Sequence, residues 1–530
     1  MSTERRSETN RSGSRSSGGN RAGSTAHRAG NTNVRRVNKK TAKADRILKL
    51  SGYVITAIMM IVGIVAIVFV AKLKLLPMKY LVIGGVALLA VGVLFIALQN
   101  WRISGLITKA LALIAIVVMV IGCAYVRYTQ SKVADMTGIA TKIDNIQVYV
   151  LKDDPAQTIM DAKDYEFGIL RELDRKNTDT FMGDLTSEVG QELKVTEQED
   201  VYLLASALYN GQVKAIIMNS AYEGFFKDTV GYEDFSDRVK SIATKDIKTD
   251  VEKAEENKDY LHGENTFTIY VSGVDTRGSL NSNSNSDVNI LITINRTTHQ
   301  ILLLTTPRDF YVPLSISGGV PDKLTHAGGH GIDVSKDTLA MLYEVNVEHY
   351  VKINFIGFEK IINTLGGISV WSDYAFSEVL EESEAIDIHE GWNDLNGSQA
   401  LTFARTRHGL EGGDRARGKN QLIVIEAVFD KLISPSILSN YTQLLDDISD
   451  CMVTSMSYDD IAELVREQLD SGAKWDIQKY SVNGFDASGP TWSAGSQELY
   501  VMEPDMETVN TAKELLRKMY NDEMISVPEE

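Results

Sequence analysis

Three long apolar runs near the start of the chain form the most prominent pattern in the sequence. They cover roughly 51–71, 80–98 and 106–126, and no acidic residue interrupts them. Each run is close to the ~20 residues that a helix needs to cross the hydrocarbon core of a bilayer. The pattern therefore predicts three transmembrane helices within residues 49–128.

A basic, polar leader precedes these runs. Residues 1–48 are mainly Ser, Gly, Asn and Arg, which bury too little apolar surface to offset the entropy of ordering, so we expect this leader to be disordered. It is too long for a secretory signal peptide, and further apolar runs follow it. Because basic segments stay in the cytoplasm, the leader is predicted to be cytoplasmic and the chain after Tyr128 extracellular. Binding of nucleic acid or lipid by the leader is the alternative interpretation.

The region 135–250 alternates strand-like and helix-like segments. The strand-like segments are NIQVYVL (145–151) and QVKAIIMN (212–219), and the helix-like ones are DVYLLASALYN (200–210) and EDFSDRVKSIA (233–243). This alternation is typical of a small α/β unit. The sequence there holds no paired His or Cys and no Gly-rich phosphate loop. We interpret it as an accessory or spacer domain, with the polar segment 244–265 as its boundary.

A larger α/β domain is predicted after Thr266. Its first three strands are FTIYVSGVD (267–275), VNILITINR (288–296) and QILLLTT (300–306). No helix separates them, so they should pair as antiparallel neighbours. Helices and strands then alternate, which places helices on both faces of the sheet and predicts an α/β/α sandwich with a mixed sheet.

Charged residues stand at the ends of these strands. If the pairing is correct, one edge of the sheet collects Asp275, Arg277, Asp287 and Arg308. Carboxylate oxygens suit Mg²⁺ bound to phosphates, and Arg side chains grip phosphate oxygens in pairs. The alternative is a capped loop with an ordinary Arg–Asp pair, but four charges at one edge need something to bridge them.

A turn with the sequence DKLTHAGGHG (322–331) adds two candidates. Lys323 is a possible further phosphate contact, and the glycines would allow a ligand to approach the backbone closely. A histidine flanked by glycines is more often structural than catalytic. We therefore expect His326 to have a structural role, with direct chemistry as the alternative.

The stretch FARTRHGLEGGDRARGKNQ (403–421) gathers arginines in a chain that is otherwise acidic. A short helix should end at Arg405 and Arg407, and a second helix should start at Asp414. The spacing of Asp414, Arg417 and Gln421 puts them on one helical face, at a helix N-terminus that favours anions. A surface salt-bridge face is the usual alternative, but apolar residues next to Arg405 indicate a segment half turned to the core.

Charge and cysteine content narrow the class of protein. The formal net charge is −17, and the basic residues concentrate in the first 129 positions, so the remainder is strongly acidic. Such a surface should not bind nucleic acid non-specifically. Only Cys123 and Cys451 occur, and Cys123 lies in an apolar run, so a disulfide framework is excluded.

Six ordered motifs resemble those of the LytR–CpsA–Psr family. They are GVDTRG (273–278), the Ser-Asp before VNILITIN (286–287), TTPRDF (305–310), DKLTHA (322–327), LNGSQALTFARTR (395–407) and GDRARGKNQ (413–421). The motif core covers about 266–435 and the expected domain 263–525. The resemblance implies a membrane-anchored, Mg²⁺-dependent phosphotransferase of Gram-positive bacteria. Its reaction would move a glycopolymer, such as teichoic acid or capsule, from a polyprenyl-pyrophosphate carrier to peptidoglycan and release polyprenyl phosphate.

The resemblance also implies a role for each candidate. Asp275 and Asp287 resemble the metal ligands, and Asp414 resembles a general base or a residue that orients one. The pyrophosphate contacts would be Arg308, Lys323, Arg405, Arg407, Arg417 and Gln421. The family commonly has Arg immediately before Ser-Asp, where this chain has Asn285, so one pyrophosphate contact is either missing or replaced by Arg277. The lipid tail needs an apolar groove, for which residues 349–365 and 421–432 are candidates.

Three other functions fit the same residues. A module that binds polyprenyl phosphates without turnover would have the same cluster of arginines. A pyrophosphate hydrolase would differ only in using water as the acceptor. An envelope-linked regulator is the third, although the sequence shows no helix-turn-helix signal.

Overall fold

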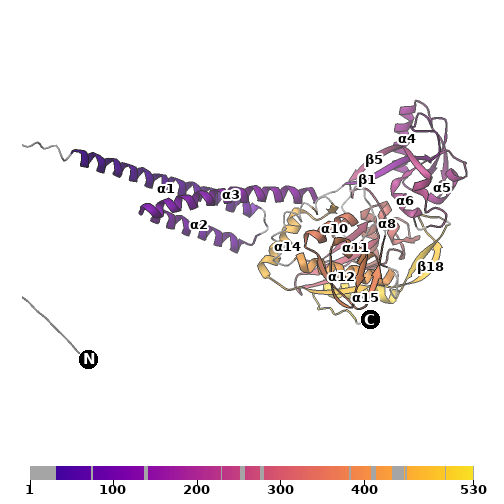
Figure 1. Ribbon diagram of the computed structural model, residues 1–530. Helices are drawn as coiled ribbons and strands as arrows, with labels where there is room; N and C mark the ends of the chain where they lie inside the picture. The colour runs from indigo at the N-terminus through magenta and orange to yellow at the C-terminus, as the bar shows by residue number, and fades with distance from the viewer. Residues whose placement is uncertain are drawn as a thin grey trace, which may run out of the picture. The chain divides into compact units, whose positions relative to one another are not determined.

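The computed structural model places the chain as a group of apolar N-terminal helices followed by α/β domains (Figure 1). The described residues are 32–72, 74, 76–136, 141–227, 229–250, 257–274, 280–380, 384–406, 414–432, 447, 451–495 and 497–528, with the side chains of 32–41, 129–130, 132–136, 141, 250 and 414–415 excepted.

Three apolar helices are long enough to cross a membrane. They are α1 (Thr32–Lys72), α2 (Met78–Leu98) and α3 (Arg102–Met136), with apolar stretches at Ala42–Lys72, Met78–Leu98 and Arg102–Tyr128. Met59, Phe95 and Ala112 form their shared core. Because α1 begins at Thr32, the prediction of disorder up to residue 48 was wrong for its last part. Extending an existing helix needs no new nucleation, which explains the additional turns.

The accessory domain contains a five-stranded mixed sheet in the order β3-β2-β4-β1-β5. Helices α4 and α5 pack against it, and buried side chains fill both faces of the sheet. Its elements are β1 (Thr141–Leu151), β2 (Glu166–Leu170), α4 (Arg175–Val189), β3 (Lys194–Gln198), α5 (Val201–Tyr209), β4 (Ala215–Asn219), η1 (Ser220–Tyr222), α6 (Glu223–Phe226), α7 (Phe235–Arg238) and β5 (Val239–Asp250).

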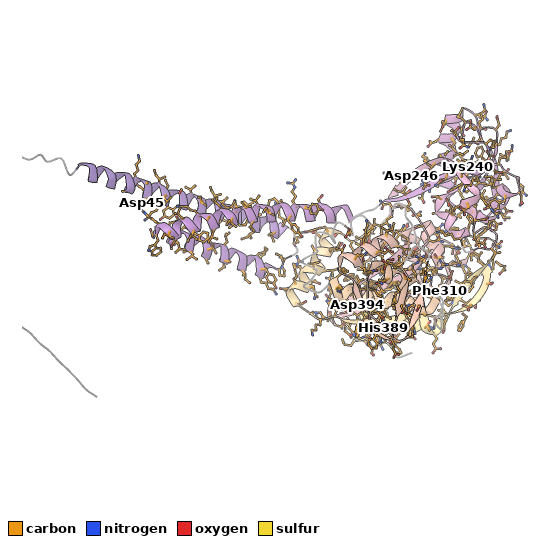
Figure 2. The ribbon with its side chains drawn as sticks, viewed as in Figure 1. Asp45, Lys240, Asp246, Phe310, His389 and Asp394 are labelled. Atoms are coloured by element: carbon orange, nitrogen blue, oxygen red, sulfur yellow. The ribbon has the colours of Figure 1, made fainter. Side chains whose placement is uncertain are left out.

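One predicted helix of this domain was wrong. Residues 233–243 form only the single turn α7 before β5 begins at Val239, and β5 pairs with β1 from Leu151 back to Thr141. Figure 2 labels Lys240 and Asp246 on this strand. Cross-strand pairing along most of β1 outweighed the local helical pattern. The strand also occupies the first part of the segment predicted as the domain boundary.

The second domain is built on a six-stranded mixed sheet in the order β16-β11-β6-β7-β8-β17. The three predicted strands pair as antiparallel neighbours, which confirms the expected topology, and β11 and β17 add parallel to β6 and β8. The strands are β6 (Thr266–Val274), β7 (Val288–Asn295), β8 (Gln300–Thr305), β11 (His349–Asn354), β16 (Met452–Thr454) and β17 (Asp476–Ser481).

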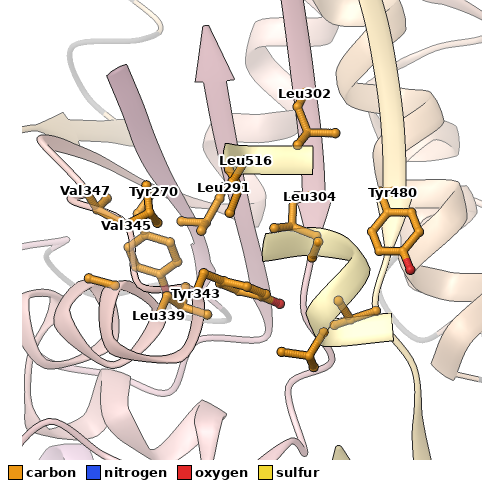
Figure 3. Close-up of a cluster of buried hydrophobic side chains, with 14 of the residues drawn as sticks. Tyr270, Leu291, Leu302, Leu304, Leu339, Tyr343, Val345, Val347, Tyr480 and Leu516 are labelled. Carbon is orange, nitrogen blue, oxygen red and sulfur yellow. The ribbon is translucent and has the colours of Figure 1, made fainter. Parts of the chain in front are cut away.

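Helices cover both faces of this sheet, so the α/β/α prediction is confirmed. On one face, Tyr270, Leu291 and Leu304 pack against α9 and α15 (Figure 3). On the other, Ile290, Ile292 and Leu303 pack against α12 and α14. The helices are α8 (Leu324–His330), α9 (Ile332–Tyr343), α10 (Phe355–Thr364), α11 (Gly397–Arg405), α12 (Asp414–Leu432), α14 (Tyr458–Ser471) and α15 (Met506–Tyr520).

Four two-stranded sheets complete the domain and carry no predicted site residue other than Lys323. The pairs are β9 (Tyr311–Pro313) with β10 (Pro321–Lys323), β12 (Ile368–Ser372) with β15 (Gly391–Leu395), β13 (Phe376–Glu378) with β14 (Ile386–Ile388), and β18 (Gly484–Pro490) with β19 (Glu498–Pro504). Helix α9 begins at Ile332, and Ser335 is buried within it.

Candidate active site

A cavity of about 1020 Å³ lies between the sheet and helices α10, α11 and α12. Its floor comes from alternate residues of the central strands, because side chains on one face of a sheet recur every second position. The floor residues include Ile269, Val271 and Gly273 of β6, Val288 and Ile292 of β7, and Val351 and Ile353 of β11.

The cavity is charged at one end and apolar along the rest. Arg417 and Gln421 of α12 line it first, followed on the same helical face by Val424, Val428 and Leu432. From Arg417 to Leu432 the helix rises by about 22 Å. This arrangement suits a long amphiphile with an anionic head and a hydrocarbon tail. Both segments predicted to form an apolar groove, 349–365 and 421–432, contribute to the lining.

Four charged side chains form a chain of ion pairs beside the polar end. Arg308 Nη1 lies 2.7 Å from Asp287 Oδ1, and its Nε lies 3.4 Å from Asp309 Oδ2. Lys323 Nζ lies 2.5 Å from Asp309 Oδ1. Asp287 and Arg308 line the cavity, whereas Lys323 is buried behind them. The predicted direct phosphate contact of Lys323 is therefore not what the geometry shows, since Lys323 supports Arg308 through Asp309.

Helix α11 delivers Arg405 to the same cavity. The helix starts at a capping box, in which the Asn396 side chain accepts from Gln399 N and the Gln399 side chain accepts from Asn396 N. Arg405 is its last residue, and its guanidinium lies 4.7 Å from the ring centroid of Phe355. Stacking on an aromatic ring limits the side chain to few conformations and leaves the guanidinium edge available for anions.

Helix α12 supplies Arg417 and Gln421, as their spacing predicted. Both side chains are buried, and both line the cavity. Gln421 Nε2 donates to Ala404 O at 3.4 Å, which ties α12 to α11. A second, smaller depression brings Arg417 and Gln421 together with Asp287 and Arg308. The structure thus unites residues from three motifs that are far apart in the sequence.

Four predicted site residues lie wholly or partly outside the described residues. Asp275, Arg277 and Arg407 are among the undescribed positions, and for Asp414 only the backbone at the start of α12 is described. Strand β6 ends at Val274, immediately before Asp275, and Asp287 N donates to Gly273 O at 2.9 Å. Among the described residues, no group of three His, Cys, Asp or Glu side chains could hold a metal ion.

His326 belongs to a buried structural network, in agreement with the favoured interpretation of the sequence. His326 Nδ1 lies 2.7 Å from Asp322 Oδ1, and Asp322 Oδ2 accepts from Ser493 N at 2.8 Å and from Ser493 Oγ at 2.5 Å. Burial disfavours the charged carboxyl, but His326 and the Ser493 donors outweigh burial and lower the pKa of Asp322. The network joins the DKLTHA motif to the C-terminal part of the domain.

Lys352 is a supporting residue that the sequence interpretation missed. It lies buried on β11, and its Nζ donates to Ser282 O at 2.7 Å, in the loop that leads to Asp287. Burial lowers the pKa of Lys352 to about 8. A lysine at an otherwise apolar strand position is the signal that could have identified it.

The accessory domain also contributes to the cavity, which the sequence did not predict. Asn145, Ser220, Glu223, Gly224 and Lys227 line it together with residues of the larger domain. No local motif marks these residues, since only the packing of the two domains brings them to the site.

Comparison with known sequences assigns the family. The sequence model of the LytR_cpsA_psr family matches residues 232–515, more than half of the chain. The chain belongs to the LytR–CpsA–Psr family. The match extends from the last part of the accessory domain to α15, and it confirms the assignment made from the six motifs.

Several named relatives share about 30% sequence identity with this chain. Teichoic acid transferase TagU of Enterococcus faecalis is 29% identical over 260 residues, which are 48% of this chain and 84% of the relative. TagT of Bacillus subtilis is 30% identical over 210 residues, or 38% of this chain and 64% of the relative. Biofilm regulatory protein A of Streptococcus mutans is 31% identical, over 49% of this chain and 64% of the relative.

Solved structures of related domains show similar coverage. The crystal structure of TagV from B. subtilis matches 50% of this chain and all of TagV, at 24% identity and a TM-score of 0.41. A structure described as TagT bound to LI-WTA matches 49% of this chain and 92% of TagT, at 23% identity and a TM-score of 0.38.

The ion-pair chain predicts a large effect of Lys323→Met on stability. Removing one partner from a buried pair costs about 3–5 kcal/mol, and Asp309 and Lys323 are 7% and 6% exposed. Lys513→Met breaks the exposed pair with Glu344, and such pairs contribute about 0–1 kcal/mol. Thermal unfolding of the purified protein should show a much lower melting temperature for Lys323→Met than for Lys513→Met. Equal shifts would contradict the supporting role of Lys323.

Proposed function

We propose that this protein transfers a glycopolymer from a polyprenyl-diphosphate carrier to peptidoglycan and releases polyprenyl phosphate. The observation that carries the proposal is the single cavity with arginines at one end and an apolar lining along α12. The family assignment supports the reaction class, since the related proteins of E. faecalis and B. subtilis are named as teichoic acid–peptidoglycan transferases.

The cavity accounts for both parts of such a carrier. A hydrocarbon tail would bury apolar surface against Ile425, Phe429 and Met452, which removes it from water without a polar penalty. A diphosphate at the polar end would meet Arg308, Arg405 and Arg417, whose guanidinium groups form strong charge-assisted hydrogen bonds. Neutralising phosphate charge there also favours a leaving phosphate.

Asp287 fits a Mg²⁺ site at this end. Its carboxylate lies on the cavity wall beside Arg308, and oxygen ligands of this kind suit a hard divalent cation bridging phosphates. Asp275 is the second proposed ligand. When bound, the ion would offset negative charge on the diphosphate.

The proposed reaction is a displacement at one phosphorus of the diphosphate. An acceptor hydroxyl of peptidoglycan attacks the phosphorus that bears the polymer, and a new P–O bond forms. The P–O bond to the lipid-bearing phosphate breaks, and polyprenyl phosphate leaves with the bonding electron pair. Asp414 accepts the proton of the hydroxyl. Arg308 and Arg417 balance the charge that develops on the leaving oxygen.

The apolar helices support the proposed placement of the protein at the membrane. All three are long and apolar enough to span a bilayer, and a polyprenyl carrier is itself confined to the bilayer. In the proposed topology all three helices cross the membrane, the basic leader stays in the cytoplasm and both α/β domains lie outside.

A reconstituted assay tests the function. Full-length protein in detergent would receive a polyprenyl-diphosphate-linked oligosaccharide, Mg²⁺ and peptidoglycan fragments. The expected result is oligosaccharide covalently attached to peptidoglycan with an equal amount of polyprenyl phosphate released. Release without attachment would identify a hydrolase, and binding without release would identify a carrier-binding module.

Asp287→Ala should abolish Mg²⁺-dependent transfer while the protein remains folded. Asp287 lies immediately before β7 and is partly exposed. Its loss therefore removes a proposed metal ligand and the ion pair with Arg308, but it does not open the core. Asp430→Ala on the exposed side of α12 is the matched control. A Mg²⁺ titration of transfer rate would check both variants, and full activity of Asp287→Ala would exclude the metal assignment.

Arg417→Ala and Asp414→Asn should separate binding from chemistry. Loss of the Arg417 contact should weaken polyprenyl-diphosphate binding by about 1.5–3 kcal/mol and lower turnover as well. Asp414→Asn cannot accept a proton, so turnover should fall strongly while binding is unchanged or tighter. Lys419→Ala, exposed on the same helix, is the control. If Asp414→Asn and Arg417→Ala weaken binding equally, Asp414 only positions Arg417.

A further inference from the structure

The accessory domain is bonded to the loop that carries Asp287. Ile143 N donates to Asn281 O at 2.9 Å, and Asn283 Nδ2 donates to Asp144 Oδ1 at 2.7 Å. Each contact joins β1 of the accessory domain to the segment between β6 and β7. The loop before Asp287 is therefore positioned from both domains.

Asn285 makes a further contact between this loop and the accessory domain. Its Nδ2 donates to Gly224 O at 3.0 Å. A Cβ on Gly224 would stand 3.0 Å from Asn285 Cγ, a distance that leaves no space for additional atoms. Asn285 itself carries no charge, so it supplies no cation to this part of the cavity rim.

The accessory domain presents its own charged residues at this rim. Glu223 is fixed there, since its Oε1 accepts from Tyr149 OH at 2.5 Å and its Oε2 accepts from Ser236 Oγ at 2.7 Å. Lys227 follows at the end of α6, one turn later, and it is exposed and lines the cavity. Gly224, between them, contacts Asn285, which places this segment beside the loop that ends at Asp287.

We propose that α6 and Lys227 of the accessory domain complete the head-group end of the cavity, with Lys227 as a binding residue for the diphosphate of the carrier lipid. This inference rests on the proposed function. Lys227 adds an ammonium group to the cavity that Arg308, Arg405 and Arg417 line from the larger domain. The flexible stem of a lysine lets the charge reach an anion from an exposed position. The accessory domain then contributes directly to substrate binding and is more than a spacer.

The test measures binding of geranylgeranyl diphosphate to full-length protein in detergent. Lys227→Met removes the charge and keeps the length of the side chain, and Lys227→Arg restores a cation. Lys214→Met removes an exposed lysine elsewhere in the accessory domain, where it stacks over Tyr165. We expect the Kd to rise about 10-fold for Lys227→Met. It should stay near the parent value for Lys227→Arg and Lys214→Met, with all melting temperatures similar.

Three different results would overturn the inference. If the parent binds the diphosphate and Lys227→Met binds equally well, Lys227 plays no part in the head-group site, and the proposed transferase function is unaffected. If the parent itself does not bind the diphosphate, the proposed function fails and the inference fails with it. If Lys227→Arg binds the diphosphate as weakly as Lys227→Met does, the positive charge at position 227 is not what binds the diphosphate.

Discussion

The ion-pair chain from Lys323 through Asp309 and Arg308 to Asp287 is the constraint on which the site depends. Arg308, Asp309 and Lys323 are all at most 12% exposed, so each buried charge must be compensated within the protein. Alternating signs along the chain meet that requirement. The outer members, Asp287 and Arg308, then face the cavity with their positions fixed by groups behind them, which is the condition for binding a charged ligand in a defined geometry.

The sheet determines where the apolar part of the cavity can lie. One face of β6, β7 and β8 is filled by α9 and α15 with large side chains. The other face is covered by α12 and α14 only in part, and the space between β6, β11 and α12 remains open as the cavity. Gly273 shows how closely the strands approach there, because a Cβ would stand 2.8 Å from Val288 Cβ. Helix α12, which covers part of this face, thereby provides both Arg417 and a row of apolar residues that line the cavity.

The accessory domain precedes the larger domain in the sequence, and it also contributes residues to the cavity. Its contacts reach the loop before Asp287 through backbone and side-chain bonds, and a further ion pair joins Lys142 to Asp333 of α9. The family resemblance indicated a departure at Asn285, and this side chain packs against Gly224 of the accessory domain.

The sequence by itself determined the apolar helices, the antiparallel order of β6, β7 and β8, and the common helical face of Arg417 and Gln421. Those features follow from local periodicity and connection length, which act over a few residues. The sequence did not show that Lys323 lies behind Arg308 or that Lys352 contacts Ser282. It also did not show that β5 forms in place of a predicted helix, or that residues of the accessory domain line the cavity. These depend on which segments meet in space. A buried charge is stable only beside its partner, and a strand only beside its neighbour, so tertiary structure alone decided them.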